Sequence, residues 1–588
     1  MSISELKIRF SNPGTNKRTR MTRRDFLGSA AAGMLAAPWL ASTVAWAQVV
    51  LEPDQRKRIE AAIPTKSFVP PRRHRKLLIF DLNVGYGGHR SIATSNLAFK
   101  LMGAKTGAFE TVISRDPSVF KTKNLRRFDA VFLNNTVGNL FEDPALRQSL
   151  IEFVYGGGGL LGVHGTSVAF TRWPGAYEDW SEFGIMLGAR GASHRDSNER
   201  VFIKLDDPNH PINEPFDGKG FEYADEFFRV HGPYSRHRVR VLFSIDTEKT
   251  DLNQGPARGN CFREDNDYAL AWVRQYGRGR VFYCTIAHNP YVFWDPKMLQ
   301  FYLAAAQFAL GDLPAPTTPS SKLTPAIRSQ EKLGWRLGIE AYTFHKYTLF
   351  ETIERTARLG LPYMGGLSFQ KVSKEIPKNF DDQLTEDELK HIRLKLDAAG
   401  VRLLTYYIHR IPGDEAGCRK VFEFARKIGI ETFMSEPLPE ALDTIEKFCD
   451  DYDINVAIHN HDQKASPLYW HPEGILKVCQ GRSKRIGACG DLGYWMRSGI
   501  DPIKAVNTLK ERLITVQMHD LHELSPEGHD VSWGTGVGKS GQFIEQIHRL
   551  GIRPTMFGLE YSYNWFESMP EIKRCIDFFN KVSVKLAK

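Results

Sequence analysis

Short apolar runs recur along residues 76–313, and stretches with helical spacing lie between them. Runs of this length that alternate with helical patterns are typical of strands and helices that follow each other along the chain. We therefore predict an α/β sandwich around a mostly parallel sheet, similar to the flavodoxin and amidotransferase folds. The predicted strands are Lys76–Phe80, Ala130–Asn135, Gly159–His164, Val201–Leu205, Val239–Ile245 and Arg280–Ile286.

The pattern becomes more regular over residues 333–588, where eight strand-like runs alternate with helical stretches. Eight such units in a segment of this length match a (β/α)₈ barrel in number and size. The runs are Leu337–Thr343, Tyr363–Leu367, Val401–Tyr407, Glu431–Ser435, Asn455–His459, Ile486–Asp491, Ile514–His519 and Thr555–Glu560. The clearest helical stretches are Leu349–Leu359, Glu386–Ala399, Cys418–Ile428, Pro439–Tyr452 and Pro502–Glu511.

Two segments fall outside these domains. Residues 314–332 begin with four prolines in twelve positions, which argues against a helix or a central strand, and we predict an interdomain linker there. Residues 48–75 form an N-terminal extension.

Residues 1–47 have the order of an export signal. A basic region ends in Arg23-Arg24-Asp25-Phe26-Leu27, a moderately apolar stretch follows, and Ala45-Trp46-Ala47 offers a cleavage site. The segment resembles a twin-arginine (Tat) signal peptide, which implies export of a folded protein to the periplasm or the extracellular space. Gly33 and Pro38 interrupt the apolar stretch, so we expect no stable membrane span after the signal is removed. An uncleaved N-terminal anchor is the alternative.

Charge and cysteine content narrow the functional classes. The net charge is +10, but residues 1–47 carry seven Lys/Arg against Glu5 and Asp25, which accounts for +5 of it. The remaining chain has no strongly basic balance, and a nucleic-acid partner is disfavoured. The seven cysteines include no C-x-x-C pair, so neither a disulfide framework nor a thiolate zinc site is indicated.

Polar residues end five successive strands of the predicted barrel. Active sites of such barrels are built from residues at these strand ends. Burying several carboxylates and imidazoles together is costly unless a cation compensates their charge. Because the set mixes oxygen and nitrogen donors, we predict a divalent ion of the Mn, Zn, Co or Fe kind. The residues are Glu436, His459, His461, Asp491, Gln517, His519 and Glu560.

Two motifs carry a family resemblance for the second domain. The segment Gly487-Ala-Cys-Gly-Asp491-Leu-Gly-Tyr-Trp495 and the closing Gly558-Leu-Glu560-Tyr561 resemble the xylose-isomerase-like barrels, a superfamily of sugar isomerases and epimerases that includes endonuclease IV. The resemblance implies a divalent metal held by Glu, Asp, His and Glu on the later strands, with glutamates that also move protons.

Carried onto this sequence, the metal ligands are His459, Asp491, His519 and Glu560. His459 stands where the family has its first glutamate. Gln517 aligns with the usual histidine, while His519 is the better ligand chemically, and this choice stays open.

We predict catalytic roles for Glu436, His461 and Glu560, with Glu436 able to supply the missing carboxylate. Trp533 is a candidate platform for stacking a sugar, and His409 and His522 are candidate substrate contacts at the pocket mouth. DNA repair of the endonuclease IV kind is disfavoured, because no basic face accompanies the predicted pocket.

The first domain also resembles a known family. Tyr155-Gly-Gly-Gly-Gly-Leu-Leu-Gly-Val-His164 is similar to the trehalose-utilisation (ThuA-like) branch of the class I glutamine-amidotransferase fold. His164 stands where amidotransferases have their cysteine nucleophile, so amidase chemistry is not supported. His164 is a candidate acid/base residue of a sugar pocket, with His194, Glu226 and His288 beside it. A purely structural His164 is the alternative. We expect His89 to face the same crevice.

Together the two domains predict an exported, metal-dependent enzyme that removes the proton next to a sugar carbonyl. Cleavage of an oxidised (3-keto) glycoside is slightly favoured, because exported proteins commonly meet glycosides. A sugar isomerase or epimerase is the alternative, and a carbohydrate-binding protein with a structural metal is a second one. We expect a small sugar or glycoside as the only partner, with an oligomer left open.

Overall fold

The computed structural model describes residues 51–171 and 180–588. The predicted twin-arginine signal lies outside the described residues. The described residues belong to one compact unit, Val49–Lys588. Within them, no helix has both the length and the apolar character required to cross a bilayer.

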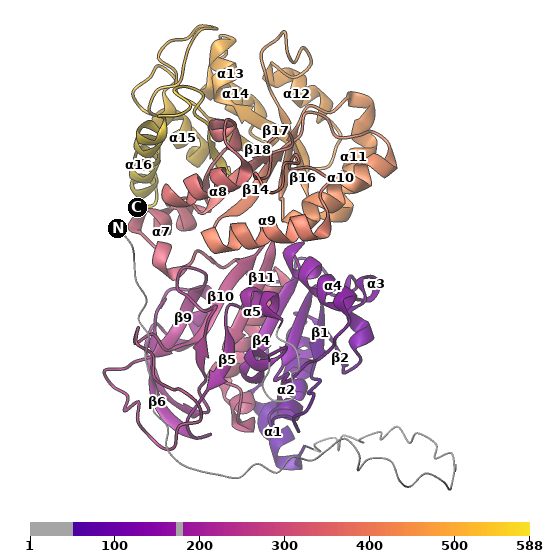
Figure 1. Ribbon diagram of the computed structural model, residues 1–588, viewed down its shortest axis with the longest axis vertical. Coiled ribbons are helices and arrows are strands. Elements are labelled where there is room, and N and C mark those ends of the chain that lie inside the picture. Colours follow the sequence, from indigo (N-terminus) through magenta and orange to yellow (C-terminus); the bar gives the residue numbers. More distant parts are fainter. Residues whose placement is uncertain (1–50, 172–179) are drawn as a thin grey trace, which may run out of the picture. The chain divides into compact units, whose positions relative to one another are not determined.

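The first domain contains a nine-stranded sheet with the order β2-β1-β3-β4-β11-β10-β9-β6-β7 (Figure 1). Its strands are β1 (Lys76–Phe80), β2 (Glu110–Ser114), β3 (Ala130–Asn134), β4 (Gly159–Val163), β6 (Glu199–Leu205), β7 (Phe221–Asp225), β9 (Arg240–Ile245), β10 (Ala269–Tyr276) and β11 (Gly279–Cys284). A separate two-stranded sheet pairs β5 (Arg190–Ser193) with β8 (Arg229–His231).

The prediction of a mostly parallel sheet is wrong. Neighbouring strands run parallel from β2 to β11, but every pair from β11 to β7 is antiparallel. The change of direction begins at the β10–β11 hairpin. Its turn contains Gly277 at φ 60°, where a Cβ would lie 2.5 Å from the backbone oxygen of Tyr155. Only glycine fits that turn, and a hairpin needs no crossover helix that the sequence pattern could reveal.

The sheet lies between two hydrophobic cores, one on each face. Leu77 and Ile79 of β1 pack into one core, whereas Leu78 and Phe80 pack into the other. The first core includes residues of α2 and α6, and the second includes residues of α4 and α5. Side chains that alternate between two buried faces explain why the predicted strands are continuous apolar runs. The helices are α1 (Pro53–Ala62), α2 (Ile92–Thr106), α3 (Thr122–Leu125), α4 (Pro144–Tyr155), α5 (Ser181–Leu187) and α6 (Pro296–Leu310).

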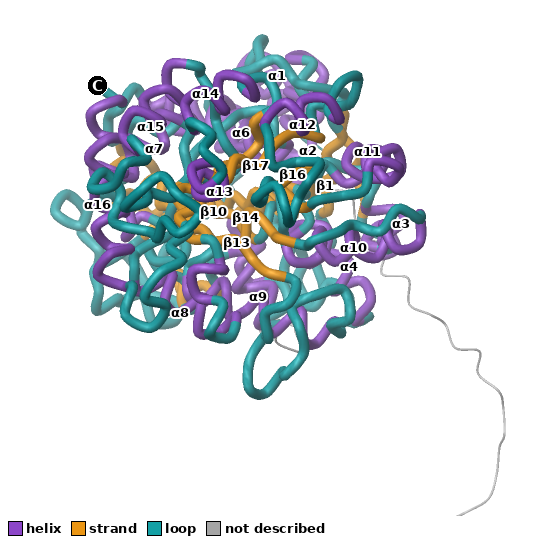
Figure 2. The backbone as a smooth tube through the Cα atoms, turned by 90° about the horizontal axis from the view of Figure 1, so that it is seen from above, coloured by secondary structure: helices purple, strands orange, loops and turns teal. Residues whose placement is uncertain are grey.

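The second domain is a closed barrel of eight parallel strands, which confirms the predicted fold. Figure 2 looks onto it, with strands such as β14 and β17 inside and helices such as α8, α9 and α16 outside. The strands are β12 (Leu337–Ile339), β13 (Tyr363–Leu367), β14 (Arg402–Tyr407), β15 (Thr432–Ser435), β16 (Asn455–His459), β17 (Ile486–Asp491), β18 (Leu513–Met518) and β19 (Phe557–Leu559). The helices are α8 (Leu349–Arg358), α9 (Glu386–Ala399), α10 (Glu415–Ile428), α11 (Leu442–Tyr452), α12 (Pro472–Val478), α13 (Leu492–Arg497), α14 (Pro502–Leu509), α15 (Ser540–Arg549) and α16 (Met569–Leu586).

The segment predicted as a linker contains a helix. α7 (Pro325–Leu333) occupies its second half, with the Thr324 hydroxyl accepting a hydrogen bond from the Ile327 backbone N–H and Gly334 ending the helix at φ 73°. Pro325 stands at the first helical position, where the missing N–H costs no helical hydrogen bond. Pro325, one of the prolines that argue against a helix in the sequence pattern, is therefore the first residue of one.

Candidate functional site

Four of the predicted metal ligands come from consecutive barrel strands. His459 ends β16 and Asp491 ends β17, while His519 and Glu560 follow β18 and β19 directly. All four are at least nine-tenths buried. Because consecutive parallel strands are neighbours in the closed barrel, their carboxyl ends bring these side chains to one face.

Asp491, His519 and Glu560 form a group whose potential ligand atoms all lie within 4.8 Å of one another. The Oδ2 atom of Asp491 lies 3.6 Å from Nε2 of His519, which in turn lies 3.9 Å from Oε1 of Glu560. Both Asp491 Oδ2 and His519 Nε2 are buried without a hydrogen-bond partner. Unpaired buried polar atoms are rare and costly, so two that face each other fit a cation between them.

His459 lies at the edge of this group. Its Nε2 is 3.6 Å from Asp491 Oδ2 and contacts Oε1 of Gln517. The Gln517 amide nitrogen donates to Glu560 Oε2 at 2.9 Å. Gln517 and His519 thus both point into the barrel. His519 belongs to the three-residue group, and Gln517 links His459 to Glu560.

The charges of the group depend on one another. Burial raises the pKa of Glu560 to about 7. Burial opposes ionisation of Asp491 as well, but His519 and His459 hold its pKa well below the usual range. Burial disfavours the charged form of His519, yet Asp530 and Asp491 raise its pKa well above normal. Asp491 therefore carries a negative charge at neutral pH, and that charge both disfavours ionisation of Glu560 and favours a cation nearby.

A pair of side chains from neighbouring strands lies beside the group of Asp491, His519 and Glu560. Nδ1 of His461 is 2.5 Å from Oε1 of Glu436, which makes a carboxylate–imidazole pair. Burial works against the imidazolium, but the hydrogen bond to Glu436 raises the pKa of His461. The His461 ring lies 4.5 Å from the His459 ring and 4.6 Å from the Tyr494 ring, measured between centroids. This pair can accept or donate a proton at the edge of the group of Asp491, His519 and Glu560.

The three predicted substrate contacts differ in position. His409 is exposed, with Nδ1 3.8 Å from Glu436 Oε1, so it lies beside the pair. His522 is exposed and stacks on His529, with the two ring centroids 3.9 Å apart. Trp533 is only 3% exposed and belongs to the barrel core, where it packs near Phe579. The prediction of a sugar-stacking role for Trp533 is therefore wrong, because its ring has no free face.

The sequence reasoning missed two residues of this site. Glu340 follows β12 and is 1% exposed, and burial together with Glu560 raises its pKa well above normal. Glu340 could have been found from the sequence, because it is a polar residue that directly follows the apolar run Leu337–Ile339. Asp530 lies in the loop after β18 and accepts a hydrogen bond from His519, and no local pattern marks that role.

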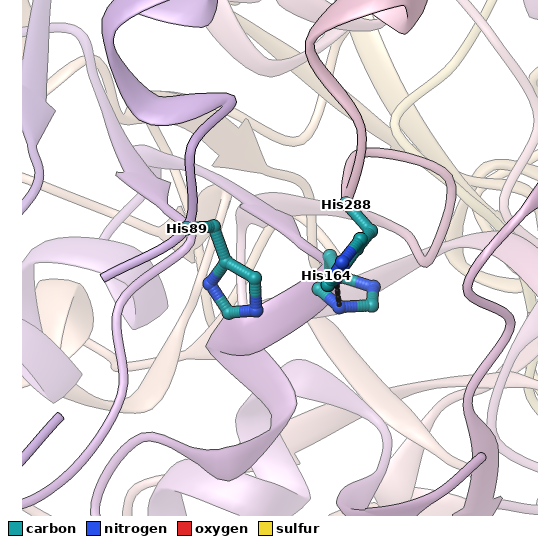
Figure 3. A group of neighbouring side chains, drawn as sticks. All are labelled: His89, His164 and His288. Atoms are coloured by element: carbon teal, nitrogen blue, oxygen red, sulfur yellow. Dashed lines mark hydrogen bonds between the residues drawn. The ribbon is translucent and has the colours of Figure 1, made fainter. Parts of the chain in front are cut away.

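The first domain brings a second polar cluster together. His164 follows β4 with φ 39°, a left-handed conformation that non-glycine residues rarely adopt. Its Nε2 lies 3.3 Å from His288 Nδ1 and 3.4 Å from Glu226 Oε1, and His194 Nδ1 lies 3.2 Å from Glu226 Oε2. The His89 ring is 4.9 Å from the His164 ring between centroids. The predicted residues of the crevice are thus in contact, and Figure 3 shows the imidazoles of His89, His164 and His288 facing one another.

Burial keeps two of these imidazoles neutral. It lowers the pKa of His89 well below normal and that of His288 to about 4, with His164 adding to both effects. Burial also opposes the charge on Glu226, but its hydrogen bonds with His164 and His194 and the fields of His164 and His288 hold the pKa of Glu226 well below its usual range.

The first domain matches a known protein family. Residues 76–309 match the family model ThuA, described as trehalose utilisation. No curated protein matches the chain.

Three solved structures illustrate the similarity. An uncharacterized protein from Parabacteroides distasonis ATCC 8503 is 32% identical, covering 42% of this chain and 99% of its own, with a TM-score of 0.35. A ThuA-like protein from Bacteroides uniformis ATCC 8492 is 20% identical, covering 41% of this chain and 91% of its own, with a TM-score of 0.34. A D-tagatose 3-epimerase-like protein is 16% identical, covering 42% of this chain and 98% of its own, with a TM-score of 0.33.

The chain thus joins a domain that matches the ThuA family model to a closed barrel of eight parallel strands.

Proposed function

We propose that the barrel is a metal-dependent sugar isomerase or epimerase that moves the proton next to a sugar carbonyl. The observation that carries the proposal is the pair of buried, unpartnered atoms, Asp491 Oδ2 and His519 Nε2, which face each other 3.6 Å apart. Asp491, His519, Glu560 and His459 would hold the ion. A bound divalent ion would act as a Lewis acid toward the carbonyl and its neighbouring hydroxyl.

The proton transfer is assigned to groups that the site already polarises. His461, hydrogen-bonded to Glu436, is the proposed base, because a neutral imidazole beside a carboxylate accepts a proton readily. Glu560, whose Oε1 lies 3.9 Å from Nε2 of His519 and whose Oε2 accepts a hydrogen bond from Gln517, is the proposed second group. Two such groups suffice to remove a proton and return it.

Isomerisation or epimerisation is preferred over cleavage because neither loses a group: epimerisation only removes and returns the carbon-bound proton, and isomerisation also moves one hydroxyl proton between neighbouring oxygens. Cleavage of a 3-keto glycoside uses the same first step and then requires protonation of a leaving group. We also propose that the protein is exported, because residues 1–47 resemble a twin-arginine signal peptide.

The proposal is tested by incubating purified protein in D₂O with ketoses and with 3-keto glycosides. We expect metal-dependent incorporation of deuterium at the carbon next to the carbonyl, together with an epimer or isomer of the ketose. Release of the aglycone with little epimer would favour cleavage. If the protein binds sugar but exchanges no hydrogen in any ketose or 3-keto glycoside, it is a binding protein, and the enzymatic proposal is wrong.

A further inference from the structure

Outside the barrel, one cluster of buried donor atoms is not explained by the proposed function. It lies in the first domain, where His89 follows β1, His164 follows β4 and His288 follows β11. These strands are parallel members of one sheet, so their carboxyl ends share an edge. Polar residues gathered at such an edge commonly form a ligand site.

Three atoms of the cluster make a nearly equilateral triangle. His164 Nε2 lies 3.3 Å from His288 Nδ1 and 3.4 Å from Glu226 Oε1, and His288 Nδ1 lies 3.5 Å from the same carboxylate oxygen. Ligands at about 2.0–2.1 Å from a tetrahedral zinc ion are separated by about 3.3–3.4 Å. The three separations therefore match one face of a tetrahedral metal site.

His89 supplies a fourth donor. Its potential ligand atom lies within 4.8 Å of those of His164 and His288. In Figure 3 the Nε2 side of the His89 ring faces the other two imidazoles, whereas Nδ1, which is buried without a hydrogen-bond partner, lies on the far side of the ring. Nε2 is therefore the atom that a cation at the centre of the cluster would meet.

Neighbouring groups orient the donors as they do around known metal ions. Nδ1 of His164 lies 2.9 Å from the backbone oxygen of Thr285, so its N–H points there and its Nε2 lone pair points into the cluster. His194 holds the other carboxylate oxygen of Glu226 at 3.2 Å. Such outer hydrogen bonds fix the tautomer and the direction of metal-binding side chains.

We propose that the first domain binds a second divalent transition ion, of the Zn²⁺ class, through His89, His164, His288 and Glu226. Three imidazoles and one carboxylate suit zinc, and an alkaline-earth ion would require more oxygen donors. The proposal assigns His164 Nε2 to the ion. It does not depend on the function proposed for the barrel.

The test is metal stoichiometry on the full mature chain, with Co²⁺ as a spectroscopic probe. After chelation, the wild type should bind two equivalents of Zn²⁺. A D491N/E560Q variant, in which the barrel group is disabled, should keep one equivalent and show the intense visible band of tetrahedral Co²⁺. Adding His288→Gln to that variant should weaken the remaining affinity at least tenfold. His237→Gln, an exposed histidine in the same domain, should change nothing.

Each outcome separates the two sites. If D491N/E560Q binds no metal, or if His288→Gln leaves its Co²⁺ band unchanged, the second site does not exist. If the wild type binds one equivalent that His288→Gln removes and D491N/E560Q does not, this site stands and the barrel metal fails. Glu226→Gln, with circular dichroism as a check of folding, repeats the test if the histidine variant does not fold. Retained full affinity in a folded Glu226→Gln variant would remove the carboxylate from the ligand set.

Discussion

His519 Nδ1 lies 2.7 Å from Asp530 Oδ1, and both side chains are almost completely buried. The hydrogen bond uses the Nδ1 proton and leaves Nε2 of His519 free to face Asp491. Asp530 also accepts hydrogen bonds from the Ser562 backbone N–H through its second oxygen, so its own orientation is fixed. His519, a proposed metal ligand, is thus positioned by a residue of the loop that follows its strand.

We expect Asp530→Asn to weaken metal binding by about 10–100-fold, the range typical of outer-shell partners of metal-binding histidines. The amide can still hydrogen-bond but no longer supplies a negative charge. Binding is measured by competition with a chelator of known affinity. Glu523→Gln, an exposed carboxylate of the same loop, serves as the control and should bind as the wild type does.

Asp491→Asn and Glu560→Gln should each reduce metal affinity by more than Asp530→Asn, with activity falling in parallel. Each change removes an anionic oxygen from the metal group at nearly constant volume, so folding should survive. Metal content by elemental analysis and turnover of the best substrate are the two readouts. Unchanged metal content together with unchanged turnover would contradict the assignment.

The stability of these variants offers a further check. The wild type should lose thermal stability when the ion is chelated, because bound metal stabilises the folded state by mass action. The variants should respond less to chelation than the wild type. An equal response in all three proteins would place the stabilising ion elsewhere.

Glu436→Gln should move the acid limb of the pH–rate profile to lower pH and reduce kcat. Burial alone lowers the pKa of His461, and the bond to Glu436 is what raises it. Without that carboxylate the His461 imidazole loses its proton at lower pH. The neutral, active base is then present at lower pH, but it is a weaker base. The measurement is kcat against pH. His409→Gln, at an exposed neighbour of the pair, should leave the limb in place.

Acid should destabilise the first domain through His210. Its Nε2–H donates to the Pro316 backbone oxygen at 3.0 Å, and its Nδ1 accepts from the Ile212 backbone N–H at 3.3 Å. Burial lowers its pKa to about 4, against about 6.5 in an unfolded chain. The unfolded state therefore binds the proton first, and the free energy of unfolding is lost as pH falls from about 6.5 towards 4, by up to about 3 kcal/mol.

Denaturant unfolding at pH 7.5 and pH 5 measures this effect. His210→Gln should be less stable than the wild type at pH 7.5 but should lose less stability between the two values. His237→Gln provides the exposed control, with the slope of the wild type. Identical pH slopes for His210→Gln and the wild type would show that His210 is not the titrating group.

Replacing Arg23-Arg24 by Lys-Lys should leave the precursor unexported, because a twin-arginine signal is recognised as an address. Fractionation of cells that express each form, followed by immunoblotting, measures it. Unchanged export of the double variant would remove the twin-arginine interpretation.

The sequence by itself predicted the barrel strands and the polar residues that end them. Strands buried on both faces must be continuous apolar runs, which is why Tyr363–Leu367, Asn455–His459 and Ile486–Asp491 have the predicted bounds. A polar residue that ends such a run in a parallel barrel must lie at the active face, so Asp491 and Glu560 could be named without coordinates.

Only the tertiary structure decided which of these groups meet and which are covered. Half of the first sheet is antiparallel because β9, β10 and β11 follow one another and pair directly, as β6 does with β7, without the crossover helices that a sequence pattern reveals. Trp533 packs into the barrel core through contacts with a segment distant in sequence, because helix α16 follows it by more than thirty residues. Likewise the pairing of His519 with Asp530, and the triangle of His164, Glu226 and His288, require loops and strand ends to converge in space.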